Sequence, residues 1–579
     1  MIRRAVLGFI SSFLLILAVP GDVHSAAQAP GGNPDVLMTT MQDELHRASD
    51  SLAKMDPAPY FISYSVHDEE SAVAIGIQGG LANSTKTRVR HVDVVMRVGS
   101  AELDNSHQEN RGSAISSGVL PLEDDSDAIS RVLWRLTYGE YRRASQAFMN
   151  VKTKTQVNAK EEDTSADFSK EAPQTHLAGK AVPAGANQKA LEDLAKKLSG
   201  LFRKYPLVYS SMVLVSRQNT RWHFASTEGT KLVTDGGVVR LVMQAETRAD
   251  DGMELMRVET FQAEDLGGLP KEAELVVKAE KMASDLEKLR SAPVAEPYDG
   301  PALLSGRSAA VFFHEVLGHR LEGHRQRGEQ EGQTFTKKIN QLVLPEFISV
   351  ADDPTVRTLN GTDLSGYYQY DDEGIPAKRV EVVKDGVLKN FLMSRMPIAN
   401  FAQSNGHGRA QPGLMATGRQ GNLIVSSTKT VKDKELRDKL LEEVKKQGKP
   451  YGLYFEDIQG GFTLTQRALP QAFQVLPVLV WRVYPDGRPD ELVRGVDIVG
   501  TPIAAMNRII VTGDKLETFN GVCGAESGGV PVAAVAPAIL FSDMEVQKRP
   551  HSLNRPPILP PPGSEVTQTN NTQKPGGRQ

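Results

Sequence analysis

The sequence VFFHEVLGHRLEGH places histidines at His314, His319 and His324, and a glutamate, Glu315, directly after the first. In the pattern His-Glu-x-x-His, one helical face presents two imidazoles that bind zinc, and the glutamate acts as a general base. Here one more residue separates the first two histidines. On a straight helix, four residues rotate a side chain by about 40° and five by about 140°, so this pair can share an ion only if the helix ends or bulges. Gly318 lies between them and can accommodate such a break.

The same pattern has a simpler interpretation. In it, Glu315, His319 and His324 line the solvent side of a helix whose other side, around Val316 and Leu317, is buried. The string is a weak signal by itself, so both interpretations remain open. A third histidine is typical of metzincin zinc helices, but the spacing of His324 does not match that motif.

Cys523 is the single cysteine of the chain and lies in a segment of small residues before an apolar strand. A hydrolytic zinc site commonly has three protein ligands, and thiolate is a good zinc ligand. Ligation would also protect the thiol from oxidation. The alternatives are a buried, inert cysteine and a cysteine nucleophile. A serine nucleophile is not indicated, because the chain has no Gly-x-Ser-x-Gly motif.

The N-terminus has the order of a secretory signal peptide: a basic start, an apolar run from Ala5 to Val19, and small residues around Ser25. The alternative is a short membrane anchor, although the run is shorter than the about 20 residues that a span needs. We therefore expect residues 1–25 to be a signal peptide, and the protein to be periplasmic or secreted with no membrane span after its removal. One cysteine can form no internal disulfide, so Cys523 should be buried or ligated in an oxidising compartment.

Length and pattern indicate two domains, because 579 residues are too many for one core. We expect an α+β protein: a mixed N-terminal domain over 31–300 with an exposed, polar insertion over about 160–187, and a strand-dominated domain over 301–548 with one motif-bearing helix. A disordered, proline-rich tail follows over 549–579. Helical periodicity marks residues 36–55, 127–157, 188–204, 271–290 and 431–447. The 67 basic and 71 acidic residues are nearly balanced, so nucleic acid is not an expected partner.

The motif belongs to a longer pattern. HEVLGHRLEG (314–323) resembles the signature of the TldD/PmbA family of metallopeptidases, in its active TldD-type branch. Further segments match that family in order: YDDEGIPAKRVEVVKDGVLKNFLMSR (370–395), NGHGRA (405–410), VRGVDIVGTP (493–502) and GVCGAESGGVPV (521–532). The residues before 301 are similar to the family only in length and texture.

The resemblance implies a zinc ion held by His314, His319 and Cys523, with Glu315 as the base. It implies a peptidase that cleaves unfolded or short peptides bound as extended strands, and a dimer, either of identical chains or with a TldE-like paralogue. His324 stands where the family tends to have an acidic residue, so we expect it to support the site or to be exposed. The other possibility is a catalytically vestigial subunit that binds peptides or assists assembly.

Four further residues are candidates for substrate binding. Gly460 and Gly461 would offer a sheet edge to an extended peptide, with an ordinary turn as the alternative. His407 and Arg409 would lie near the developing oxyanion or contact the peptide, unless they belong to a tight, solvated loop.

Overall fold

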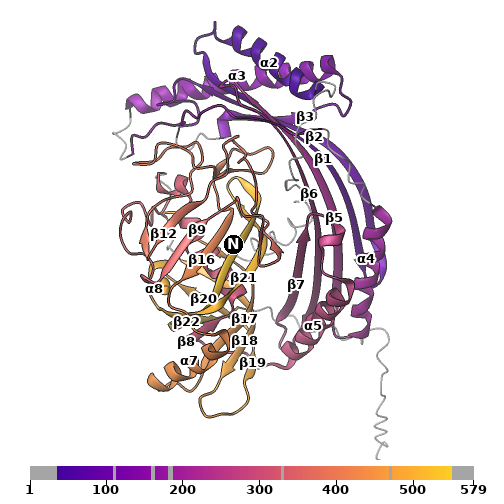
Figure 1. Ribbon diagram of the computed structural model, residues 1–579, viewed down its shortest axis with the longest axis vertical. Helices are drawn as coiled ribbons and strands as arrows, with labels where there is room; N and C mark the ends of the chain where they lie inside the picture. Colours follow the sequence, from indigo (N-terminus) through magenta and orange to yellow (C-terminus); the bar gives the residue numbers. More distant parts are fainter. Residues whose placement is uncertain are drawn as a thin grey trace, which may run out of the picture.

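The computed structural model describes residues 35–107, 112–157, 163–179, 187–327, 331–468 and 472–550 (Figure 1). The expected signal peptide and nearly all of the expected tail lie outside these ranges. The described chain forms two large sheets with helices, and the expected α+β fold class is confirmed. No helix among the described residues has the length and apolar character needed to cross a bilayer.

The first sheet is long and curved, and the N-terminal half of the chain builds it (Figure 1). Its strand order is β3-β2-β1-β5-β6-β4, with β7 also paired to β6. The strands are β1 (Pro59–Ile77), β2 (Gly80–Val98), β3 (Ile115–Val119), β4 (Thr175–Leu177), β5 (Ser210–Ser226), β6 (Lys231–Arg248) and β7 (Glu254–Ala263).

Four helices cover one face of this sheet: α2 (Val36–Leu52), α3 (Ser126–Val157), α4 (Gln188–Leu201) and α5 (Glu272–Ser291). On β1, Tyr64 and Val66 pack under α2 and α3, while Ala72 and Ala74 pack under α4. These residues all have even numbers on one strand, so they share a face because strand side chains alternate. The odd-numbered face of β1 therefore turns away from the helices.

The second sheet is built from the C-terminal half. Its strand order is β13-β12-β9-β16-β22-β20-β18-β17-β8, and β22 also pairs with β8, which closes five strands into a ring. The strands are β8 (Tyr298–Leu304), β9 (Ile348–Asp352), β12 (Val380–Lys384), β13 (Val387–Leu388), β16 (Asn422–Ser427), β17 (Gly452–Thr463), β18 (Phe473–Val483), β20 (Val496–Gly500) and β22 (Gly528–Lys548). β19 (Glu491–Val493) pairs with β18, and β21 (Ile509–Ala525) forms a long hairpin with β22. Small pairs are β10 (Thr358–Leu359) with β11 (Thr362–Asp363), and β14 (Gly408–Arg409) with β15 (Thr417–Gly418).

The motif-bearing helix is α6 (Gly306–Val316), and all of its residues except Arg307, at its start, are buried. The ring of Phe312 lies 5.7 Å from that of Phe473 and 5.2 Å from that of Phe541, both in edge-to-face contact. Two other helices, α7 (Asp433–Lys446) and α8 (Pro502–Met506), complete this half. Because Glu315, His319 and His324 are themselves buried, the interpretation of the motif as a solvated helix face is wrong.

The expected exposed insertion is partly wrong as well, because residues 163–179 pack between the two halves. Phe168 is buried between the guanidinium groups of Arg97 and Arg395, whose central carbons lie 3.9 and 3.8 Å from its ring centre. Asp167 accepts hydrogen bonds from the backbone of Asp104 and from Arg327. Cation–π and ion-pair contacts hold a polar segment that composition alone predicts to be solvated.

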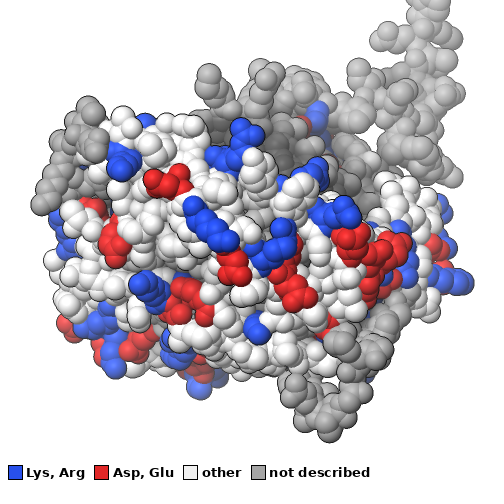
Figure 2. All heavy atoms as spheres, turned by 90° about the horizontal axis from the view of Figure 1, so that it is seen from above, with Lys and Arg blue, Asp and Glu red and all other residues white. Residues whose placement is uncertain are grey.

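Surface charge is mixed on the end of the molecule that carries α2 and α3. Figure 2 shows that face with small groups of basic and acidic side chains next to one another. Among the described residues of this face, no continuous field of one sign is present that would attract a polyanion.

Glu140 on α3 gives the first half a pH-dependent stability. Its carboxylate accepts a hydrogen bond from Ser116 at 2.6 Å and pairs with Arg143, but burial raises its pKa to about 7. Between pH 4.5 and about 7 the unfolded chain loses this proton first, so stability falls as pH rises through that window.

We expect Glu140→Gln to remove this pH dependence. In the wild type, ionisation of Glu140 lowers the free energy of unfolding by up to about 3 kcal/mol above pH 7. The measurement is chemical unfolding of both proteins at pH 5 and pH 8. The variant should lose less stability between the two values than the wild type; an equal or larger loss in the variant would contradict the assignment.

Candidate metal centre

The end of α6 brings His314 and His319 together. The helix stops at Val316, Leu317 caps it, and a 3₁₀ turn, η4 (Gly318–Arg320), follows. This break is the departure from a straight helix that the five-residue spacing requires. It places the two imidazole rings 5.1 Å apart, inclined by 75°.

Gly318 allows the turn for a steric reason. A Cβ atom at this position would lie 1.9 Å from the side-chain oxygen of Gln420 and 2.3 Å from its amide carbon. The amide nitrogen of Gln420 donates to the carbonyl of His314 at 3.4 Å, so Gln420 fills the space that a larger residue would need.

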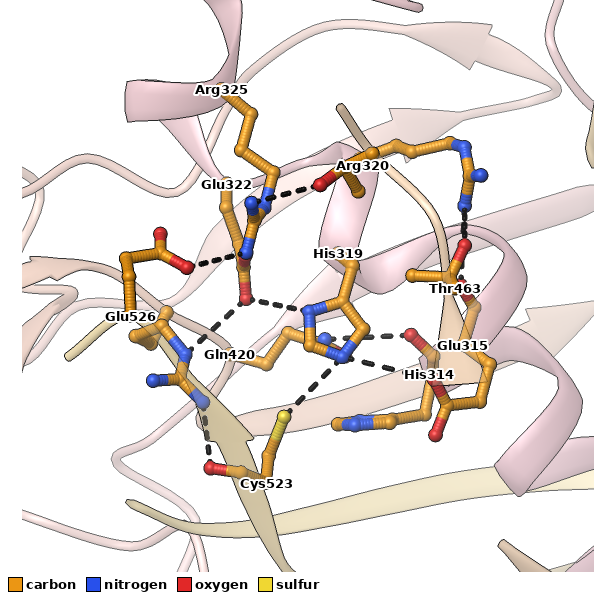
Figure 3. Close-up of polar contacts among 12 residues, drawn as sticks. His314, Glu315, His319, Arg320, Glu322, Arg325, Gln420, Thr463, Cys523 and Glu526 are labelled. Atoms are coloured by element: carbon orange, nitrogen blue, oxygen red, sulfur yellow. Dashed lines mark hydrogen bonds and ion pairs between the residues drawn. The ribbon is translucent and has the colours of Figure 1, made fainter. Parts of the chain in front are cut away.

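Cys523 completes a group of three potential ligands (Figure 3). Ligand atoms of His314, His319 and Cys523 all lie within 4.8 Å of one another, and the Cys523 Sγ is 3.3 Å from His319 Nε2. The cysteine reaches this place from β21, where it pairs directly with Val530 of β22. A helix end and a sheet hairpin, more than 200 residues apart in sequence, therefore build one buried cluster.

Protonation at this cluster favours a thiolate. Burial opposes ionisation of Cys523, but His319, His314 and Arg419 outweigh it and hold the cysteine pKa well below its ordinary value. The reverse holds for His319: burial lowers its pKa, while Cys523 and Glu322 together raise it well above the usual range. Without a metal, the cluster therefore holds a thiolate next to an imidazolium. A divalent cation that binds there takes the place of the imidazolium proton and its positive charge.

Glu322 fixes the orientation of His319. This carboxylate is fully buried, and one of its oxygens lies 3.2 Å from His319 Nδ1, so Nε2 is left facing Cys523. Although burial opposes ionisation of Glu322, His319 and Arg325 lower its pKa to about 2. A carboxylate behind a ligating imidazole is the usual support of a metal site. We assigned Glu322 no role from the sequence, although its position three residues after His319 was a usable signal.

Arg419 is a second residue that sequence reasoning missed. It donates to the backbone carbonyl of Cys523 at 2.7 Å and to the Ser527 hydroxyl at 2.8 Å. Because Arg419 directly follows β15, these hydrogen bonds connect the end of β15 to the turn of the β21–β22 hairpin. No motif in the sequence pointed to it.

Glu315 lies beside the cluster with one carboxylate oxygen 3.8 Å from His319 Nε2. It is buried, and burial raises its pKa above the ordinary value against the opposing effect of His314 and His319. Gly461 of β17 lies against it: a Cβ at Gly461 would be 2.8 Å from Glu315 Cγ. Strand β17 therefore forms a wall of the site at this residue.

A second group of potential ligands, Glu322, His324 and Glu526, lies nearby. Arg325 donates to Glu322 at 2.7 Å and to Glu526 at 3.0 Å, and His324 is itself in contact with Glu526. The protein supplies its own cations to these carboxylates, which leaves the first group as the candidate for a metal ion. His324 is 1% exposed, so the alternative that it is a surface residue is wrong.

The four expected substrate-binding residues separate into two kinds. His407 is fully buried and contacts Asp352 at 3.3 Å, and Arg409 donates to the carbonyls of Gln420 and Pro531. These partners make both residues internal braces of the loops around the site, and the expectation of direct substrate contact is wrong for His407.

Gly460 and Gly461 do lie on a strand, β17, and the alternative of a simple turn is wrong. They pair with Leu476 and Val475 of β18 on one side. On the other side β8 pairs only with residues 453–455 of β17, so within the described chain no strand covers the edge at the glycines.

Comparison with known proteins shows which family this half of the chain resembles. Residues 297–548 match the model of the PmbA/TldA metallopeptidase C-terminal domain. This region is therefore similar to the TldD/PmbA family, and the resemblance inferred from sequence is confirmed for it.

Curated relatives are similar to this chain in sequence, and a solved structure is similar to it in fold. The chain is 27% identical over 264 residues to a metalloprotease of Archaeoglobus fulgidus, covering 45% of this chain and 56% of the relative. It is 24% identical over 363 residues to a zinc metalloprotease TldD homolog of Saccharolobus solfataricus, covering 62% and 76%. TldE from Thermococcus kodakarensis shares the fold, with a TM-score of 0.56 at 13% identity over 88% of this chain and all of that one. The chain thus spans little more than half the length of the first relative.

Gly318→Ala tests the steric account of the turn. The added methyl group would displace Gln420, so we expect a loss of about 1–3 kcal/mol of stability, typical of overpacking. Gly139→Ala is the matched control, because nothing lies within 4 Å of a Cβ there and alanine favours the α3 helix. Thermal unfolding of both variants measures this; an unchanged melting temperature for Gly318→Ala would refute the contact.

Proposed function

We propose that the protein is a zinc-dependent peptidase of the TldD type. The observation that carries this proposal is the convergence of His314, His319 and Cys523 in one buried cluster with Glu315 beside it. Metalloprotease names among the relatives support it.

The donor set fits zinc. Nδ1 of His314 is buried and has no hydrogen-bond partner in the described chain, and the cluster offers two imidazoles and a thiolate. Soft sulfur with imidazole nitrogen selects zinc over magnesium or calcium, and three protein ligands leave a position open for chemistry. Bound zinc would act as a Lewis acid toward the scissile carbonyl and lower the pKa of the attacking water.

Residues of the chain itself then transfer the proton of the attacking water and keep the ligands in position. Glu315, with its raised pKa and its place beside the cluster, accepts the proton of the attacking water and returns it to the leaving amine. Glu322 keeps the His319 ring in one orientation throughout. The apolar surroundings of α6 exclude bulk water from this side of the site.

Substrates would bind as extended strands. The uncovered edge of β17 at Gly460 and Gly461 supplies backbone donors and acceptors next to Glu315. Recognition through main-chain groups reads little side-chain information, so it suits unfolded or short peptides of varied sequence.

We further propose that the protein is exported and works as a dimer. Export is supported by the signal-like order of residues 1–25. The TldE structure as a neighbour supports assembly with an identical or a TldE-like chain. The alternative function, a vestigial subunit that binds peptides without cleaving them, would need the same strand edge but no metal.

Metal content and peptidase activity test the central proposal together. We expect about one zinc per chain in the purified protein, strongly reduced in Cys523→Ser because a ligand is lost. Glu315→Gln should keep the zinc and lose at least about 100-fold in activity on a mixed peptide library. Mass spectrometry of metal and of peptide fragments gives both readings. A zinc-free wild type that protects peptides would favour the vestigial subunit.

Gly461→Ala should impair the same activity through Glu315. The new methyl group would press on the glutamate Cγ, while Gly460→Ala meets nothing within 4 Å and serves as the control. We expect activity to fall about 10-fold or more in the first variant, with zinc content unchanged in both. Equal activities would show that β17 does not set the position of the glutamate.

A further inference from the structure

Arg240 of β6 is a cation without an acidic partner. Its guanidinium donates to the side-chain oxygen of Gln262 at 3.1 Å, and no carboxylate of the described chain lies within ion-pair distance. Burial lowers its pKa to about 10. A partly buried charge that the fold leaves uncompensated is costly, and a bound anion is the common reason for keeping one.

The residues around Arg240 offer further hydrogen-bond donors on the same face of the sheet. Ser216 of β5 lies directly opposite Arg240, and Gln262 of β7 lies opposite on the other side. Gln218 is two residues beyond Ser216 on the same face; its amide nitrogen is buried beside Glu69 but makes no hydrogen bond of ordinary geometry. Cross-strand neighbours have Cβ atoms about 5 Å apart, so groups from three strands converge.

Apolar residues lie beside this polar group on the same face of the sheet. Leu214, Val242, Val73 and Ile75 form a cluster of their own on the same face. A ligand with a carboxylate next to an apolar side chain would satisfy both parts of the surface.

This face borders a cavity whose wall includes Val530, the strand partner of Cys523. It is the face away from the helices, where β5 and β6 curve past the second sheet (Figure 1). Thr234, which shares the face with Arg240 on β6, and Trp222 line a cavity of about 40 Å³ together with Gly529–Pro531. Val530 is the direct partner of Cys523. Arg240 and Thr234 are six residues apart on β6, or about 20 Å of extended chain.

We propose that Arg240, with Ser216 and Gln218, binds a carboxylate of the peptide substrate and so anchors it at a distance from the metal centre. This inference rests on the proposed peptidase function and names the substrate class: peptides with an acidic group about six or more residues from the cleaved bond. Both the C-terminal carboxylate and an Asp or Glu side chain provide this chemistry, and charge-assisted bonds from a guanidinium favour either.

The test is the binding of fluorescent ten-residue peptides to the mature protein carrying Glu315→Gln, measured by fluorescence anisotropy. Three probes share one apolar sequence: a free C-terminus, an amidated C-terminus, and an amidated C-terminus with one aspartate near the end. We expect the free acid to bind about 10-fold or more tightly than the neutral amide. Recovery by the aspartate peptide would identify a side-chain carboxylate as sufficient, whereas no recovery would identify the C-terminus as the anchor.

Arg240→Gln should abolish this difference between the probes, and Arg240→Lys should retain part of it. Arg217→Gln is the matched control, because Arg217 is next to Ser216 on β5 but points to the opposite face. The inference would be overturned if the Glu315→Gln protein with native Arg240 bound the free acid and the amide equally well, or bound neither. This comparison does not depend on the folding of any Arg240 variant. If the free acid binds more tightly but the protein with native Glu315 cleaves no peptide, the carboxylate anchor stands and the peptidase function is refuted. If that protein cleaves peptides but the acid and the amide bind equally well, the peptidase function stands and the anchor is refuted.

Discussion

The site depends on the end of α6 at Val316. One more turn of regular helix would point His319 away from His314 and leave Cys523 with a single imidazole partner. The helix ends there because a 3₁₀ turn begins at Gly318, directly after the cap residue Leu317, and because Gln420 fits into the space that the glycine leaves. The position of one ligand is thus set by the absence of a side chain.

Charge compensation holds the parts of the site together once the turn is made. Glu322 joins the helix end to Arg325, and Arg325 joins it to Glu526 on the hairpin turn. Arg419 reaches the same hairpin through the carbonyl of Cys523. Each of these buried charges has an opposite partner or a hydrogen bond, which is the condition for keeping ions inside a protein. Arg240 differs from these residues, because its guanidinium has a hydrogen bond to Gln262 but no opposite charge among the described residues.

The sequence predicted local features well and long-range ones poorly. The amphipathic pattern at 36–55 became α2 (Val36–Leu52), and that at 271–290 became α5 (Glu272–Ser291), because helical periodicity is contained within the segment. The gathering of His314, His319 and Cys523 was expected from family resemblance. The support from Glu322, which is three residues away, was open to prediction and was missed.

Other features had no local signal. The closed ring of strands depends on pairing between β8 and β22, which are far apart in sequence. The polar composition of residues 163–179 predicts a solvated segment, but Asp167, Phe168 and Ser169 are buried. Their partners, such as Arg327 and Arg395, lie more than 150 residues away in the sequence. The same is true of His407, whose burial is set by Asp352. Composition reports the cost of burial but not the partner that offsets it.

The two sides of the candidate metal centre differ in how firmly the backbone holds them. Cys523 lies close to the turn of a hairpin whose strand β22 runs for 21 residues and pairs, farther from the turn, with β16, β8 and β20; Arg419 holds the carbonyl of Cys523 near the turn itself. His319 lies on a three-residue turn after a helix end. A change in the distance between His319 and Cys523 would therefore displace the histidine turn more readily than the strand that carries the sulfur.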